Sequence, residues 1–281
     1  MTAACGEANR RGMPPSLLHT APPAPPSGTT DRLFGLLERI HGDKPWGRLL
    51  DAGTGEHSLR WVLSLPTTGW TAITGGEGGK GELGRKYAAQ LRPQDGLIVG
   101  DWADPVLLVD EQYDVILADY LLGALDGFAP YFQDRLFPRL RQHLRPGGAL
   151  YVIGLGPFPD QAETEGGRLI LEISRLRDAC ILLAGHRCYR EYPDDWARRA
   201  LEAAGLVVDH SERMSIRFRE RYVNGQLDVC LSKLPLIRDP ALVASLRAHI
   251  EDLRGRALAV VADRGGIDFG HDYVIAAHLP A

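Results

Sequence analysis

The sequence predicts an α/β protein built on a doubly wound, mostly parallel seven-stranded sheet, with a helical C-terminal insertion. Short apolar runs alternate with segments of helical periodicity over residues 31–155, which is typical of a parallel sheet covered on both faces. The remaining residues are mostly helical in pattern, with further apolar runs at 206–218 and 273–278. The chain has 281 residues and is 44% hydrophobic, which is enough to bury the core of such a sheet.

The N-terminal residues differ from the rest of the chain. Residues 1–30 are rich in proline, serine and threonine and have little that could form a core, so we expect a disordered tail. Asp31 is placed to cap a helix, because Leu33, Leu36 and Leu37 follow it at helical spacing. We therefore expect a domain over residues 31–281.

Five short strands are expected in the first half of this domain. Their ranges are 47–51, 70–74, 96–99, 113–118 and 149–154. Helices are expected at 58–65, 85–91 and 130–144, the last ending before a Pro-Gly-Gly stop signal. The glycine-rich segment 75–84 does not satisfy the phosphate-loop pattern GxxxxGK[ST], and we interpret it as a flexible connector. In the second half, helices are expected at 168–184 and 194–204.

Composition argues against several classes of protein. No stretch approaches the roughly 18 apolar residues of a membrane span, and the first residues lack the apolar core of a secretory signal. The four cysteines form no CxxC pair, which favours a reducing cytoplasm and gives no metal-site spacing. The net charge of −4 argues against a bulk nucleic-acid binder. We expect a cytoplasmic protein without a metal site and without a membrane or nucleic-acid partner.

The segment LLDAGTGEHS, residues 49–58, is the most informative. Asp51 closes the first strand, and Gly53 and Gly55 form the turn into a helix whose first N–H groups face a ligand. A dinucleotide site would require GxGxxG, but the third position is Ser58. Asp51 would repel a pyrophosphate and attract an amino group, so the pattern favours a nucleoside that bears an amino acid over NAD.

Residues 49 to about 155 resemble the class I S-adenosylmethionine-dependent methyltransferases. Four segments carry the resemblance, and they occur in the family's order: LLDAGTG, QDGLIVGDWADP, YDVILADYLL and LFPRLRQHLRPGGALYVIG. The resemblance implies a Rossmann-like methyltransferase fold, S-adenosyl-L-methionine as cofactor, and methyl transfer to a small-molecule substrate. It divides the domain into a cofactor-binding half at about 47–155 and a substrate half at about 156–281, whose surplus helices would cap the substrate pocket.

The resemblance also implies which residues bind the cofactor. These are Asp51, Gly53, Thr54, Gly55, Thr74, Glu77, Asp101, Trp102, Ala118 and Asp119. Asp101 would receive the adenine amino group, with Trp102 beside the ring. Ala118 and Asp119 would face cofactor and substrate.

Two positions depart from the family pattern. The second strand ends at Thr74, where the family carries an acid that holds the ribose, so either Thr74 or Glu77 would take that role. His57 occupies the third glycine position of the first motif and narrows the turn. These departures keep an alternative open: a catalytically degenerate methyltransferase fold that binds the cofactor or a partner protein.

The candidate catalytic residues are Asp119, Tyr120 and His186. A base is needed only where the acceptor must lose a proton, and histidine or a carboxylate can supply it. His186 begins the segment HRCYREY between two expected helices, which would form a substrate wall or pack a helix end. Arg217, Arg219 and Arg221 would share one face of a strand and bind an anion or face solvent.

Overall fold

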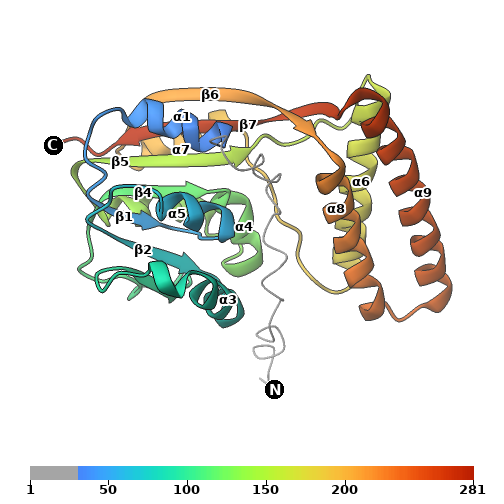
Figure 1. Ribbon diagram of the computed structural model, residues 1–281, viewed down its shortest axis with the longest axis horizontal. Helices are drawn as coiled ribbons and strands as arrows, with labels where there is room; N and C mark the ends of the chain where they lie inside the picture. Colours follow the sequence, from blue (N-terminus) through green and yellow to red (C-terminus); the bar gives the residue numbers. More distant parts are fainter. Residues whose placement is uncertain (1–30) are drawn as a thin grey trace, which may run out of the picture.

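The computed structural model describes residues 31–281, which form a single seven-stranded sheet with helices on both faces and a group of helices at one end (Figure 1). The strands are β1 (Arg48–Asp51), β2 (Gly69–Thr74), β3 (Gly96–Val99), β4 (Tyr113–Asp119), β5 (Leu144–Leu155), β6 (Val207–Phe218) and β7 (Ile267–His278). The tail expected at residues 1–30 lies outside the described residues.

The strand order is β3-β2-β1-β4-β5-β7-β6. The first five strands are parallel, and β7 is antiparallel to both β5 and β6. This arrangement confirms the predicted fold class. It also brings the carboxyl ends of β1, β2, β3 and β4 to one edge of the sheet, where open α/β sheets bind their ligands.

The helices lie between and beyond the strands. They are α1 (Arg32–His41), α2 (Glu56–Val62), α3 (Glu77–Tyr87), α4 (Leu121–Phe128), α5 (Gln133–Arg141), α6 (Glu165–Leu183), α7 (Asp194–Ala203), α8 (Glu220–Lys233) and α9 (Pro240–Arg264). No helix in the described part of the chain is long and apolar enough to cross a membrane.

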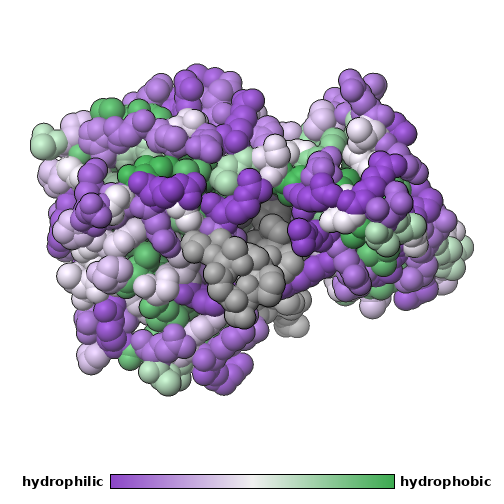
Figure 2. All heavy atoms as spheres, turned by 45° about the horizontal axis from the view of Figure 1, so that its top comes forward, coloured by the Kyte–Doolittle hydropathy of each residue, from purple (hydrophilic) through white to green (hydrophobic). Residues whose placement is uncertain are grey.

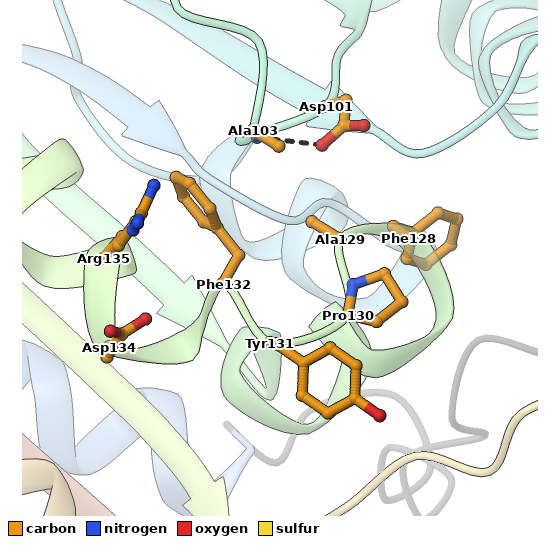
Figure 3. Close-up of a pocket in the computed structure, with 9 residues that line it drawn as sticks. All are labelled: Asp101, Ala103, Phe128, Ala129, Pro130, Tyr131, Phe132, Asp134 and Arg135. Atoms are coloured by element: carbon orange, nitrogen blue, oxygen red, sulfur yellow. Dashed lines mark hydrogen bonds between the residues drawn. The ribbon is translucent and has the colours of Figure 1, made fainter.

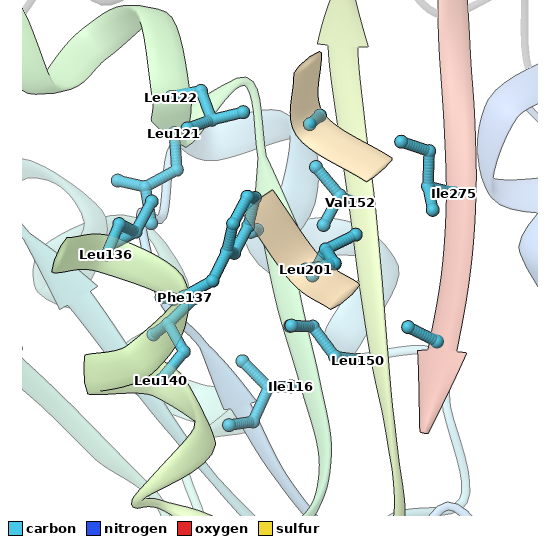
Figure 4. Packing of buried hydrophobic residues seen from close by; sticks show 14 of the residues in the cluster. Ile116, Leu121, Leu122, Leu136, Phe137, Leu140, Leu150, Val152, Leu201 and Ile275 are labelled. Atoms are coloured by element: carbon cyan, nitrogen blue, oxygen red, sulfur yellow. The ribbon is translucent and has the colours of Figure 1, made fainter. Parts of the chain in front are cut away.

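Alternate residues of each strand supply two cores, one on each face of the sheet. Leu50, Ile116 and Leu150 pack with side chains of α4, α5 and α7 (Figure 4). Their sequence neighbours, such as Leu49 and Val115, pack with side chains of α1, α2 and α3. This period of two is the pattern of strands that are buried on both faces.

Helices α6, α8 and α9 form a bundle with an apolar core of its own, at the end where β5 and β6 finish (Figure 1). Ile173, Leu227 and Leu253 are fully buried in it, and Phe218 and Ile267 extend it onto β6 and β7. The outward surface of the bundle is largely hydrophilic, with smaller apolar areas (Figure 2). These helices are the insertion that the sequence predicted.

Several local expectations were wrong. Most of the expected connector 75–84 instead belongs to α3. This helix forms despite its glycines because Leu83 and Tyr87 are buried in the core on one face of the sheet. The expected helix 130–144 is the shorter α5, and α4 was missed because its glycines weaken the helical signal.

The arginines of residues 217–221 also do not share a strand face. The strand β6 ends at Phe218, and Arg219 precedes the first turn of α8, which contains Arg221. Arg217 is paired with Asp268 across the strands (2.6 Å). The predicted anion-binding face therefore does not form.

Candidate functional site

Asp51 lies at the carboxyl end of β1 and is completely buried, with 0% of its surface exposed. Neither carboxylate oxygen has a hydrogen-bond partner of good geometry among the described residues. Burial raises the pKa of Asp51 to about 6, although the nearby Ser58 and Thr54 hydroxyls and the Gly53 N–H oppose the rise. A buried carboxylate in this state is costly unless a cation compensates it.

The turn after Asp51 leads directly into α2. The Gly55 N–H donates to Ser58 Oγ (3.1 Å), and the Thr54 N–H donates to the carbonyl of Ile73 at the end of β2 (2.6 Å). A Cβ on Gly53 would lie 2.8 Å from Leu121 Cδ1, whereas a Cβ on Gly55 would meet nothing within 4 Å. A side chain at position 53 would therefore press on Leu121 of α4, whereas position 55 faces open space.

Asp119 ends β4, the neighbour of β1, and brings a second carboxylate to the same edge of the sheet. Burial raises its pKa to about 7; the charge of His57 opposes this rise, and Asp51, Asp31 and Asp272 add to it. The carboxyl edge therefore carries several acidic groups, and the charge of His57 offsets their effect on Asp119 only in part. Such an arrangement suits a ligand with positive charge.

Tyr120 follows Asp119 in the left-handed backbone region, with φ of 48°, which is uncommon for a non-glycine residue and is found often at functional sites. Its hydroxyl donates to Asp272 Oδ1 (2.8 Å). Burial raises the pKa of Tyr120, so the phenol stays protonated as a hydrogen-bond donor. Asp272 is on β7, opposite Leu155 of β5. Sequence reasoning missed Asp272 because only the strand pairing brings it beside Tyr120.

A cavity of about 440 Å³ lies beside Asp101, the first residues after β3, and the connection from α4 to α5 (Figure 3). Its lining consists of Asp101, Ala103, Phe128, Ala129, Pro130, Tyr131, Phe132, Asp134 and Arg135. Asp101 Oδ1 accepts the Ala103 N–H (2.9 Å), so the carboxylate stabilises its own turn while it faces the rings on the opposite wall. An acid above an apolar, partly aromatic wall is suited to a flat heterocycle with an amino group.

Trp102 and Ala118 do not line this cavity. The Trp102 side chain is 4% exposed, and its Nε1–H donates to the carbonyl of Ala52 (2.7 Å), which ties the turn after β3 to the turn after β1. Ala118 is 1% exposed and belongs to the same core. Both residues therefore belong to the buried core that supports the site, not to the cavity wall.

The position where the family carries a ribose-binding acid is built differently. Thr74 is buried, and its carbonyl accepts the Gly100 N–H (3.1 Å). Glu77 is exposed as the first residue of α3. The Phe128 ring packs against Gly75 so closely that no Cβ would fit there. An aromatic ring therefore lies between the turn after β2 and the cavity beside Asp101.

The segment between α6 and α7 contributes different residues from those expected. His186 Nδ1 lies 3.1 Å from Lys233 Nζ of α8, so this candidate residue contacts the bundle. Glu191 instead packs on α4, since a Cβ on Gly123 would be 2.7 Å from its Oε2. Tyr189 packs on Gly127 of the same helix in the same way.

Comparisons with known proteins agree with this architecture. No family model matches the chain, and no curated protein is significantly similar to it in sequence. Among solved structures, a candidate methyltransferase of Bacillus halodurans matches with a TM-score of 0.58 and 14% identity, over 89% of this chain and 99% of that chain.

Two further structures match at similar levels. YcgJ of Bacillus subtilis has a TM-score of 0.53 and 14% identity, over 88% of this chain and 97% of that chain. The [4+2]-cyclase SpnF has a TM-score of 0.52 and 17% identity, over 89% of this chain and 80% of that chain. Together with the strand order, these similarities show that the chain has the class I, Rossmann-like methyltransferase fold.

Proposed function

We propose that this protein is an S-adenosyl-L-methionine-dependent methyltransferase that acts on a small molecule. The buried Asp51 carboxylate carries this proposal, because it lacks a hydrogen-bond partner of good geometry among the described residues. An ammonium group at this point would offset the desolvation of the carboxylate and hydrogen-bond to it. The amino acid part of the cofactor has such a group.

The remaining parts of the cofactor fit the neighbouring features. The open side of Gly55 would let the amino acid part approach the turn. The adenine ring would occupy the cavity beside Asp101, with its amino group toward the carboxylate and its faces near Phe128 and Phe132. When bound, the cofactor supplies an electrophilic methyl group, and the protein has to hold the acceptor in line with it.

Asp119, Tyr120 and Asp272 would act on the acceptor. The pKa of Asp119, raised by burial to about 7, allows this carboxylate to accept a proton from an acceptor near neutral pH. The Tyr120 phenol is held in one orientation by its hydrogen bond to Asp272 and would position the acceptor. We expect a small molecule as the acceptor. The segment of Glu191 packs on α4, and the bundle lies beyond the strand ends, so both would limit the space open to a larger acceptor.

A calorimetric titration with S-adenosylhomocysteine tests the proposal. We expect the full chain to bind this product with a submillimolar Kd, and Asp51→Ala to abolish the binding. The absence of binding at millimolar ligand would contradict the proposed function.

A second candidate function is ligand binding without methyl transfer. It is favoured by the Phe128 ring over Gly75 and by the exposed position of Glu77, which leave the ribose without the family's acid. A similar fold occurs in SpnF, which is described as a [4+2]-cyclase. Release of S-adenosylhomocysteine from S-adenosylmethionine with a panel of amine, phenol and thiol acceptors would support methyl transfer. Binding without turnover on the whole panel would support the second candidate.

A further inference from the structure

We propose that Arg187, in the connection between α6 and α7, is a positioning residue for the ring of the cofactor, because it holds Tyr131 in the wall of the cavity beside Asp101. Residues 187–191, called the strap below, pack along α4 and bring Arg187 to this wall. The inference rests on the proposed function, which places the adenine in this cavity.

The Arg187 side chain makes two contacts with Tyr131. Its Nη2 donates to the Tyr131 hydroxyl (3.3 Å), and its guanidinium carbon lies 5.3 Å from the centre of the ring. A cation in this position is attracted by the negative face of an aromatic ring. Arg187 is not among the lining residues of the cavity, and Figure 3 shows the Tyr131 hydroxyl on the side away from Asp101. Arg187 therefore contacts the wall without occupying the space for a ligand.

Burial alone does not fix the position of Tyr131. Its side chain is 81% exposed, and its φ of 67° lies in the left-handed region, which is uncommon for a residue with a Cβ. Phe128, another ring of the same lining, is less exposed and packs closely on Gly75. The contact with Arg187 therefore gives the Tyr131 ring a support that packing gives to Phe128.

The strap follows α4 in a regular register. Every second residue of the strap contacts every fourth residue of the helix and the loop after it. Two residues of an extended chain span about 7 Å and four helical residues span about 6 Å, so the two spacings match. The contacts, in order along the helix and the loop, are Gly123 with Glu191, Gly127 with Tyr189, and Tyr131 with Arg187.

The two glycines of α4 make room for this register. They lie four residues apart, on one face of the helix. A Cβ on Gly123 would lie 2.7 Å from Glu191 Oε2, and a Cβ on Gly127 would lie 2.7 Å from Tyr189 Cε1. Both distances are too short for real contacts, so a side chain at either position would displace the strap.

The opposite side of this connection faces the bundle. Cys188 Sγ donates to the carbonyl of Asp178 on α6 (3.4 Å), and His186, just before the strap, lies 3.1 Å from Lys233 Nζ of α8. Such alternation between two sides is the pattern of an extended chain. Figure 1 shows the connection crossing from the bundle toward the sheet. Contacts on both sides therefore fix the strap where it reaches Tyr131.

The test measures the Kd of the full chain for S-adenosylhomocysteine and for 5′-methylthioadenosine, which has the same ring and ribose but no amino acid part. Arg187→Ala is expected to weaken the binding of both ligands by the same factor, about two- to fivefold, the size of an exposed contact between a cation and a ring. Gly127→Ala should also weaken both, because its Cβ displaces Tyr189. Calorimetry measures each Kd.

A double-mutant cycle distinguishes positioning through Tyr131 from a general structural effect. Tyr131→Ala removes the ring itself, so it should weaken both ligands at least as much as Arg187→Ala. The variant with both substitutions should bind no more weakly than Tyr131→Ala alone, because Arg187 acts through this ring.

Arg190→Ala is the matched control. Arg190 is an exposed arginine of the same strap, and it lies between the two residues that contact the glycines of α4. Its truncation is expected to leave both Kd values unchanged. An equal loss of affinity in Arg190→Ala and Arg187→Ala would overturn the inference.

The remaining outcomes separate this inference from the proposed function. If the unmodified chain does not bind S-adenosylhomocysteine, the proposed function is wrong and the inference falls with it. If the chain binds it, but Arg187→Ala changes neither Kd, weakens only S-adenosylhomocysteine, or adds fully to Tyr131→Ala, the inference is wrong and the proposed function stands. Binding of S-adenosylhomocysteine without binding of millimolar 5′-methylthioadenosine has the same meaning. Should Tyr131→Ala not fold, Arg187→Ala against Arg190→Ala still decides the matter.

Discussion

The carboxyl edge of the sheet and the helical bundle differ in how their acidic residues are placed. At the sheet edge, Asp51 and Asp119 sit where burial raises their pKa to about 6 and about 7. In the bundle, many charges form pairs nearer the surface, such as Arg254 with Asp228 (2.8 Å) and Arg256 with Glu172 (2.8 Å), and the buried Lys233 of α8 lies 3.1 Å from His186. The bundle core is mainly apolar, with the polar Gln226 and Lys233 of α8 also buried.

This difference favours the sheet edge as the region that binds a ligand. Burying a carboxylate without a good partner reduces stability, so a protein keeps one only where it serves a ligand or a reaction. Exposed ion pairs contribute little to stability, and an apolar core contributes much. We therefore propose that the sheet edge binds the ligand and that the bundle stabilises the fold.

The largest expected effect is that of Asp51→Asn on ligand binding. Removing the charge that faces the ammonium group should weaken S-adenosylhomocysteine binding by about 4 kcal/mol, a factor of about 1000. The melting temperature should stay the same or rise, because the cost of burying a carboxylate disappears. Calorimetry and thermal unfolding measure the two quantities. The control is Asp126→Asn. Asp126 is also a buried acid, but it lies on α4, and this variant should bind S-adenosylhomocysteine normally. Normal binding by Asp51→Asn would contradict the proposal that the sheet edge binds the ligand.

Leu253→Ala should have the reverse pattern. This side chain is fully buried in the bundle core, so its truncation should lower the free energy of unfolding by about 2–5 kcal/mol. The Kd for S-adenosylhomocysteine should change less than two-fold. Urea unfolding and calorimetry on the same preparation give both values. A large loss of affinity in a folded Leu253→Ala protein would mean that the bundle takes part in binding.

Acidification should affect ligand binding and stability in opposite directions. The raised pKa values of Asp51 and Asp119 mean that the folded chain binds more protons than the unfolded chain between about pH 4 and pH 7. These two groups therefore lower stability as pH rises through that window. Binding of the ammonium group requires the ionised form of Asp51, so affinity should fall by up to about tenfold per pH unit below pH 6. A pH series of titrations and thermal unfolding experiments checks this. Asp51→Asn should flatten the trend in affinity and reduce the trend in stability, to which Asp119 still contributes.

The sequence predicted the parallel part of the sheet well because its signals are local. The short strands that lead to Asp51 and Asp119 are continuous apolar runs, and the turn at Gly53 and Gly55 is a contiguous motif. Asp31 was also recognised as a helix cap from its neighbours alone. These features depend on residues within a few positions of one another.

What the sequence could not predict depends on pairing between distant segments. Asp272 reaches Tyr120 only because β7 runs antiparallel beside β5. The contact of His186 with Lys233 of the bundle likewise joins segments that are 47 residues apart. The glycine-rich α3 was misjudged because burial of Leu83 and Tyr87 outweighs weak helix propensity.

The smallest expected effect concerns Asp101. Asp101→Asn keeps an oxygen for the Ala103 N–H and should weaken S-adenosylhomocysteine binding only a few-fold, by about 1 kcal/mol. Asp101→Ala also loses the turn contact and should bind more weakly than Asp101→Asn. Titration calorimetry on both variants measures the difference. Unchanged affinity in both would remove the cavity beside Asp101 from the proposed site.

A crystal structure of the full chain with S-adenosylhomocysteine tests the central claim most directly. We expect the ammonium group within hydrogen-bond distance of the Asp51 carboxylate and the adenine in the cavity between Asp101 and Phe132. A ligand bound elsewhere, or with its amino acid part away from Asp51, would contradict the assignment of function to the carboxyl edge of the sheet.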